Sequence, residues 1–374
     1  MIADANLASW LRLTLIPGVG GETQRKLLKA FGLPQVIFEA SAGALRDIIG
    51  APATERLLQA DTAAAASIDA ALRWAGEAGN HIVTLADDAY PQALLSSADP
   101  PILLYLKGRP ELLNRPGFAI VGSRNATPQG EANAEAFAAA LAAAGLTIIS
   151  GLALGIDAAA HRGALSVRHE DSGSTVAIIG TGANRIYPAR NDQLARTIAQ
   201  HGAVLSEFPL DTPALAANFP RRNRLIAGMA RGCLVVEAAA RSGSLITARL
   251  AAEAGREVFA IPGSIHAPLA KGCHQLIKQG AKLVESAQDI LEEFGAQFEG
   301  IAPRREPVVD KDAIIDPNAV QLLAVLGHDP CDIDTLAVRS DLTAEELLAM
   351  LLQLELAGHV ASLPGGRYQR LQRS

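Results

Sequence analysis

The sequence predicts an α/β protein with a Rossmann-like core, a doubly wound and mostly parallel sheet. Two observations support this fold class. From residue 81 to about residue 295, short β-rich runs alternate with helical stretches. Several of these runs, such as 119–121, 176–179 and 234–236, are apolar at every position. Strands that helices cover on both faces need such runs, which are typical of a parallel sheet.

The chain is expected to divide into three units, because its 374 residues exceed one ordinary core. A small helical domain is expected at 1–75, the Rossmann-like core at 76–298 and a winged helix at 313–374. A polar linker at 299–312, which contains Arg304-Arg305-Glu306, should join the last two units.

In the N-terminal domain, Gly-Pro breaks separate short helical stretches. Helices are expected at 7–15, 21–31, 44–49 and 53–58, with an alanine-rich connecting helix at 62–79. The segment 15–20, Leu-Ile-Pro-Gly-Val-Gly, resembles a helix-hairpin-helix turn, in which backbone amides approach a phosphate. A plain packing joint between two helices explains the segment equally well, so both interpretations stay open.

The remaining elements follow from apolar runs and turn residues. Strands are expected at 81–85, 102–106, 118–121, 147–150, 175–179, 204–207, 234–237, 258–261 and 282–284. The winged helix should contain helices at 318–326, 333–338 and 343–357 and a hairpin of 359–363 and 367–371. Thr343 and Glu346 form a capping box at the start of its third helix. That helix is acidic and leucine-rich, which favours an interaction or packing module over a reader of DNA bases.

Composition narrows the function classes. The three cysteines show no CxxC spacing, and the chain has no secretory signal and no apolar run long enough to span a bilayer. We therefore expect a cytoplasmic protein without a membrane partner. The net charge of −6 excludes a globally basic nucleic-acid binder, but a few arginines in one cleft can still bind phosphates.

Loops that leave the carboxyl ends of strands carry the candidate site, because ligands bind there in open α/β sheets. In the first loop, Gly122 permits close backbone approach, Arg124 supplies a cation, and Ser123 and Asn125 can cap the next helix. This loop lacks the GxGxxG pattern of dinucleotide binders.

The second loop, which contains Ser150 and Gly151, leads into a helix that carries Asp157 and His161 at i,i+4. These two side chains could form an acid–base couple, but a structural role is the favoured interpretation.

The third loop, at 179–188, is a Gly-rich turn that suits a phosphate, although a plain tight turn is an equal alternative.

The fourth loop is the most informative, because three arginines follow an aromatic ring near a helix N-terminus. Its candidate residues are Phe219, Arg221, Arg222, Asn223 and Arg224, and a later loop adds Ser242, Gly243 and Ser244.

These loops contain no pattern of a catalytic site. No lysine occurs between Lys107 and Lys271, so the strong cations there are arginines, which suit bidentate phosphate recognition. There is no GxSxG, no HExxH, no acid cluster for two metals and no Walker lysine. The site is expected to hold a phosphodiester without cutting it, with no cofactor and no metal.

At these loops the sequence resembles the DprA/Smf (DNA processing protein A) family, whose members are associated with natural transformation and with loading RecA onto incoming single-stranded DNA. The resemblance rests on six ordered segments: 119–124, 150–161, 219–228, 242–247, 260–263 and 272–281. The last has Gly272-Cys273-His274 where family members often have Gly-Thr-Asn. The flanking SAM-like and winged-helix domains also match.

The resemblance implies a DNA-binding protein that is not an enzyme. Single-stranded DNA would lie in a cationic pocket, with a homodimer formed through the core and RecA as a partner. The residues to which it points are Gly122, Ser123, Arg124, Ser150, Gly151, Phe219, Arg221, Arg222, Asn223, Arg224, Ser242, Gly243 and Ser244.

Two alternatives compete with this prediction. One is a nucleotide hydrolase related to lysine decarboxylase-like phosphoribohydrolases, but the Pro-Gly-Gly-x-Gly-Thr turn and following Glu of those enzymes are replaced here by 241–245, Arg-Ser-Gly-Ser-Leu. The other is a sequence-specific regulator that acts through the winged helix, whose third helix has no Lys or Arg before Arg367 and Arg370 of the wing.

Overall fold

The computed structural model describes residues 2–59, 62–167, 172–295 and 317–371. Its core is one nine-stranded sheet in the order β1-β2-β6-β5-β4-β3-β7-β8-β9. The strands are β1 (Asn80–Thr84), β2 (Leu103–Gly108), β3 (Gly117–Val121), β4 (Thr147–Ser150), β5 (Thr175–Ile178), β6 (Ala203–Ser206), β7 (Ala230–Val235), β8 (Glu257–Ala260) and β9 (Lys282–Leu283).

The pairing of the strands confirms the expected fold class. From β6 through β9 every neighbouring pair is parallel, whereas β1 and β2 add an antiparallel edge. The chain runs from β3 outward to β6 on one side and from β7 outward to β9 on the other. β3 and β7 are therefore the neighbours between which the winding direction reverses, the position where open α/β sheets bind ligands.

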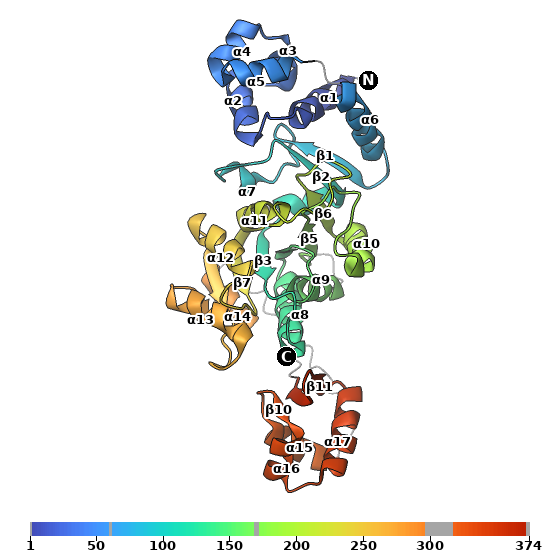
Figure 1. Cartoon of the computed structure of the whole chain (residues 1–374), viewed down its shortest axis with the longest axis vertical. Helices are drawn as coiled ribbons and strands as arrows, with labels where there is room; N and C mark the ends of the chain where they lie inside the picture. The colour runs from blue at the N-terminus through green and yellow to red at the C-terminus, as the bar shows by residue number, and fades with distance from the viewer. Residues whose placement is uncertain (1, 60–61, 168–171, 296–316, 372–374) are drawn as a thin grey trace.

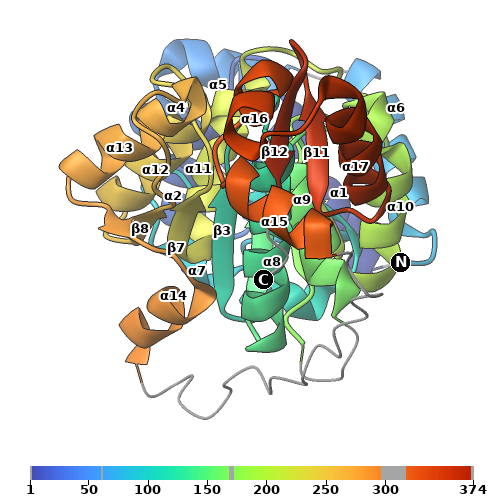
Figure 2. The same ribbon diagram turned by 90° about the horizontal axis from the view of Figure 1, so that it is seen from below.

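Alternate residues of β3 point to opposite faces, as in any strand. Ala119 and Val121 join a buried cluster with residues of α11 (Asn218–Met229), α12 (Ser244–Glu253) and α13 (Lys271–Lys278). Phe118 and Ile120 join another with residues of α8 (Pro128–Ala143), α9 (Ile156–Ser166) and α14 (Ala287–Glu293). Figure 2 shows α13 and α10 (Asp192–His201) on opposite sides of the molecule with β3 between them. Both faces are covered, and this burial explains why the strands are apolar throughout.

The core helices and short turns have these bounds: α7 (Gln92–Leu95), α8 (Pro128–Ala143), α9 (Ile156–Ser166), α10 (Asp192–His201), α11 (Asn218–Met229), α12 (Ser244–Glu253), α13 (Lys271–Lys278) and α14 (Ala287–Glu293), with 3-10 turns at Pro110–Asn114, Ala189–Asn191 and Pro268–Ala270.

The N-terminal unit is helical, as expected, and lies against the β1–β2 edge of the sheet (Figure 1). Its helices are α1 (Ile2–Leu15), α2 (Gly21–Phe31), α3 (Pro34–Glu39), α4 (Ala42–Ile49), α5 (Ala51–Leu58) and α6 (Thr62–Ala75). The break at 32–34, Gly-Leu-Pro, predicts no helix here, but α3 begins at Pro34. Proline is well suited to the first turn of a helix, because its missing N–H would have no partner there in any case. Trp74 and Tyr105 meet edge to face at 5.9 Å, which joins this unit to the core.

The C-terminal unit is a winged helix with its own buried cluster. Its elements are α15 (Pro317–Leu326), β10 (Cys331–Asp332), α16 (Ile333–Ser340), α17 (Ala344–Leu356), β11 (Val360–Leu363) and β12 (Arg367–Arg370). The capping box of Thr343 and Glu346 is confirmed. The expected linker at 299–312 lies outside the described residues, and the domain boundaries stay predictions. No helix in the described part of the chain is long and apolar enough to cross a membrane.

Candidate nucleic-acid interface

A cleft of about 630 Å³ opens where the loops after β3 and β7 meet the first turns of α11. The backbone amide of Ser123 donates to the carbonyl of Glu237 at 2.7 Å, which ties the two loops together. The lining includes the predicted residues Gly122, Ser123, Arg124, Phe219, Arg222, Asn223, Ser242, Gly243 and Ser244. The cleft thus lies at the reversal point of the sheet.

The β3–α8 loop is held by a carboxylate from the neighbouring strand's loop. Glu237 accepts hydrogen bonds from the amide and the hydroxyl of Thr127 at 2.9 and 2.6 Å, and Thr127 caps α8. The expectation that Ser123 or Asn125 caps this helix is wrong, because the helix begins at Pro128. The Ser123 hydroxyl instead accepts from the amide of Asn125 at 3.2 Å, inside the loop.

Two rings and one arginine form an aromatic surface at the mouth of the cleft. The Phe219 and Tyr187 rings lie 5.7 Å apart, and the Arg124 guanidinium lies 5.7 Å from the centre of the Phe219 ring. Tyr187 is half exposed. A Cβ on Gly180 would come within 3.1 Å of Phe219, so this glycine lets the ring pack onto the third loop. The predicted residues did not include Tyr187, although its Gly-rich loop was a candidate.

Ser150 and Gly151 lie behind the cleft and do not line it. The fully buried Ser150 hydroxyl donates to the carbonyl of Ile120 at 2.7 Å. Gly151 accepts a hydrogen bond from Arg222 at 3.0 Å through its carbonyl. Burial lowers the pKa of the Arg222 guanidinium to about 10, against the opposing effect of the Asp157 charge. Arg222 is therefore a nearly buried cation in the wall of the cleft.

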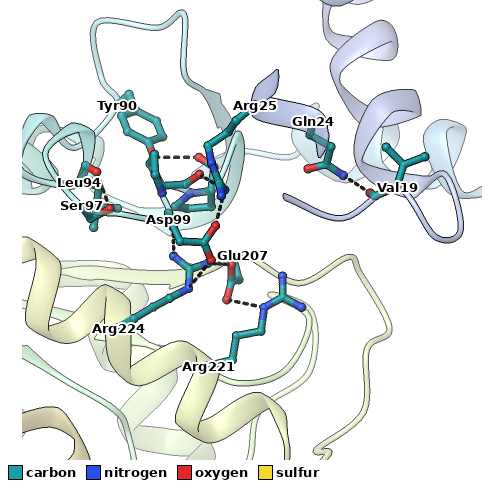
Figure 3. A network of polar contacts seen from close by, with 12 residues as sticks. Val19, Gln24, Arg25, Tyr90, Leu94, Ser97, Asp99, Glu207, Arg221 and Arg224 are labelled. Carbon is teal, nitrogen blue, oxygen red and sulfur yellow. Dashed lines mark hydrogen bonds and ion pairs between the residues drawn. The ribbon is translucent and has the colours of Figure 1, made fainter. Parts of the chain in front are cut away.

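The three arginines of α11 do not share one site. Arg222 faces the cleft, whereas Arg224 pairs with Glu207 and Asp99, and Arg221 pairs with Glu207 at 3.3 Å (Figure 3). Arg221 and Arg224 line a second cavity of about 530 Å³ between the core and the N-terminal unit. The sequence predicted one cluster of three cations, and the helix divides them between two faces.

The turn before α12 presents an open helix N-terminus to the cleft. The Ser242 and Ser244 hydroxyls lie 2.7 Å apart, and the Ser244 amide donates to the Ser242 hydroxyl at 3.3 Å. Nothing lies within 4 Å of the Cβ position of Gly243, so the backbone there is accessible. Accessible amides at a helix N-terminus favour an anion.

Two family models and several known proteins match this chain. The family model described as DNA recombination-mediator protein A matches residues 81–295, more than half of the chain. The chain belongs to the DprA/Smf family. The DprA winged helix domain model matches residues 306–366. Protein Smf of Escherichia coli strain K12 is 44% identical over 311 residues, which are 82% of each chain.

Two solved DprA structures resemble this one. DprA from Streptococcus pneumoniae matches with a TM-score of 0.67 and 40% identity, covering 77% of this chain and 97% of that one. DprA from Helicobacter pylori, whose structure concerns its single-stranded DNA binding mode, matches with a TM-score of 0.51 and 30% identity, covering 57% of this chain and 95% of that one.

In this DprA-family core, Asp157 and His161 have separate structural environments. Asp157 accepts from the amides of Gly151 and Ala153, whereas His161 Nδ1 lies 2.7 Å from the Thr175 hydroxyl. Because that hydroxyl donates to the carbonyl of Ile148, we infer that His161 carries its proton on Nδ1. These contacts agree with the structural interpretation. Among the described residues, no group of His, Cys, Asp or Glu could hold a metal ion.

Proposed function

We propose that this chain binds single-stranded DNA in the cleft without sequence preference and is not an enzyme. The observation that carries the proposal is the cleft's combination of Arg124, Arg222 and the accessible amides before α12 with the ring pair of Phe219 and Tyr187. Arginines and helix N-termini attract phosphates, and aromatic rings stack on bases of any identity.

The same combination favours a single strand over a duplex. In a duplex each base face is covered by the next base pair, so a ring can stack only on a base that has left the helix. The proposed contacts are the lining residues Gly122, Ser123, Arg124, Phe219, Arg222, Asn223, Ser242, Gly243 and Ser244. Ser150 and Gly151 would support this wall from behind, and Arg221 and Arg224 would anchor α11.

Family membership supports the finer proposals. The structure of the Helicobacter pylori relative concerns its single-stranded DNA binding mode, which supports single-stranded DNA as the ligand. We extend the proposal to a cytoplasmic homodimer formed through the Rossmann-like core. We also propose that it protects incoming single-stranded DNA and helps to load RecA onto it during natural transformation or recombination.

The surroundings of the acids favour binding over nucleotide hydrolysis. Glu237 accepts two hydrogen bonds from Thr127, and Asp157 accepts two backbone amides, so both carboxylates are engaged in holding loops. A hydrolase of the alternative class needs a carboxylate that can act on a nucleotide or a water.

The test is a fluorescence-anisotropy titration with a labelled single strand and with its duplex at several salt concentrations. We expect tighter binding of the single strand, and Arg124→Ala should lower the log–log salt slope by ~0.7, the value of one phosphate contact. Arg249→Ala on the exposed face of α12 is the matched control and should leave the slope unchanged. Duplex preference, or nucleotide hydrolysis in a parallel assay, would contradict the proposal.

A further inference from the structure

The turn between β4 and α9 is held by one carboxylate. Oδ2 of Asp157 accepts from the amides of Gly151 and Ala153 at 3.2 and 3.3 Å. Between them, Leu152 has φ 58°, a left-handed conformation that costs a non-glycine residue about 1 kcal/mol. The Asn191 side chain donates to the carbonyls of Leu152 and Ala153. The turn is thus fixed through its amides by Asp157 and through its carbonyls by Asn191.

Arg222 rests on this turn. Its Nη2 donates to the Gly151 carbonyl at 3.0 Å, and the side chain is almost fully buried. A Cβ on Gly151 would lie 1.6 Å from Nη1 of Arg222, so only glycine leaves room for the guanidinium. The Gly151 amide therefore donates to Asp157, and the Gly151 carbonyl accepts from Arg222. Through these two hydrogen bonds Gly151 links the carboxylate to the cation.

The charges of the two side chains are complementary. Burial disfavours the ionised form of each, and each charge opposes that effect on its neighbour. A buried guanidinium without a counter-charge is strongly destabilised. Asp157 also lines the cleft, where a bare negative charge would repel phosphate. The contacts of Gly151 with both Asp157 and Arg222 indicate that the carboxylate holds Arg222 in place.

We propose that Asp157 is a positioning residue of the cleft, which fixes the Gly151 turn and the Arg222 guanidinium so that Arg222 can contact a DNA phosphate. The inference rests on the proposed single-stranded DNA binding and assigns a role within that site. Asp157 acts through Arg222 and does not itself bind DNA.

Asp157→Asn tests the inference, because the two possible roles change affinity in opposite directions. The amide oxygen of asparagine can still accept from both backbone amides. The variant therefore removes only the counter-charge that keeps the buried Arg222 guanidinium against the Gly151 carbonyl. If Asp157 merely adds a negative charge to the cleft, loss of that charge strengthens single-strand binding and steepens its dependence on salt. If Asp157 positions Arg222, loss of the charge weakens single-strand binding roughly tenfold. It also lowers the slope of log affinity against log salt concentration by ~0.7, because the contact of Arg222 with a phosphate is lost.

A double-mutant cycle with Arg222→Met separates an effect through Arg222 from an independent effect. We expect Asp157→Asn to cause no further loss in the Arg222→Met background, whereas an additive loss would overturn the inference. Gly151→Ala, which displaces the guanidinium without removing the carboxylate, should weaken binding to a similar degree. Glu253→Gln, an exposed acid on α12, is the matched charge control. Thermal unfolding checks that each variant is folded.

The wild-type titration tests the proposed function on its own, since absence of single-strand binding there overturns that proposal. The unliganded crystal structure of Asp157→Asn then tests the positioning role without DNA. Loss of the bond from Arg222 to the Gly151 carbonyl supports the inference, and an unmoved Arg222 contradicts it.

Discussion

At the scale of single residues, burial sets the charge state of His161. Its side chain is fully buried, Nδ1 contacts Thr175, and Nε2 has no hydrogen-bond partner within the described parts of the chain. Burial, reinforced by the nearby charges of Arg222 and Arg162, lowers the pKa of His161 to about 3. The histidine therefore stays neutral in the folded protein at pH values where an unfolded histidine is charged.

This predicts a pH-dependent contribution to stability. Between about pH 6.5 and pH 3 the unfolded state binds a proton that the folded state does not, so the free energy of unfolding falls by ~1.4 kcal/mol per pH unit as the pH is lowered. Urea unfolding of wild type and His161→Gln at pH 7.5, 6.5, 5.5 and 4.5 measures it. The stability advantage of wild type over the variant should shrink through this window.

The exposed His266 supplies the control for that measurement. His266→Gln makes the same chemical replacement at a solvent-exposed position, and its unfolding is followed at the same four pH values. A wild-type advantage over His161→Gln that does not change with pH would show that His161 titrates at its ordinary pKa when folded.

At the scale of elements, the cleft depends on close packing between two loops. Gly155, at the N-terminus of α9, has φ 70°, and a Cβ there would lie 2.3 Å from the carbonyl oxygen of Ser123. The amide of Ile156 donates to that same carbonyl at 3.1 Å. The β4–α9 turn therefore supports the β3–α8 loop that carries Arg124, and both loops can approach only because residue 155 has no side chain.

Gly155→Ala should lower the free energy of unfolding by about 3 kcal/mol, because backbone strain and a clash with a carbonyl add together. Gly243→Ala is the comparison, since its φ is −63° and its Cβ position is open. That variant should change stability by less than ~0.5 kcal/mol. Equal losses in urea unfolding of the two variants would mean that the loops adjust to residue 155.

The sequence predicted the bounds of the strands better than it predicted which side chains meet in the folded protein. Apolar runs placed the nine strands of the core sheet close to their observed bounds, because burial on both faces leaves a continuous apolar signal. The start of β7 was missed by four residues, since Ala230-Arg231-Gly232 interrupts that signal. Tyr187 is absent from the predicted site residues because its place beside Phe219 depends on the packing of a loop against the first turn of α11, which is distant in sequence.

At the scale of the whole molecule, a chain of charges connects the N-terminal unit to α11. Arg25 of α2 pairs with Asp99 and donates to the Pro100 carbonyl at 3.2 Å, and Arg224 bridges Asp99 and Glu207 (Figure 3). The Glu207 side chain is only 2% exposed. The helix-hairpin-helix-like turn at 15–20 borders the cavity beside this network, and Asp99 lies near the start of α2. These contacts favour the packing-joint interpretation of that turn.

Glu207→Gln should lower the free energy of unfolding by about 3 kcal/mol, because Arg224 and Arg221 would lose a buried counter-charge. The control is Glu22→Gln, which removes an exposed pair with Lys26 and should change stability by less than ~0.5 kcal/mol. Urea unfolding, followed by Trp10 and Trp74 fluorescence for the N-terminal unit and by circular dichroism for the chain, measures both. A loss no larger than that of the control would mean that the network does not hold the two parts together.

The sequence by itself determined the parallel sheet, the helical and winged-helix units, the family and the loops that carry the site. These follow from local patterns of burial and from the composition of the turns. Only the tertiary structure decided which arginines of α11 enter the cleft. Residues 221 and 224 are three apart and share one helix face, whereas 219 and 222 share another, and packing of the whole helix decides which face meets the cleft.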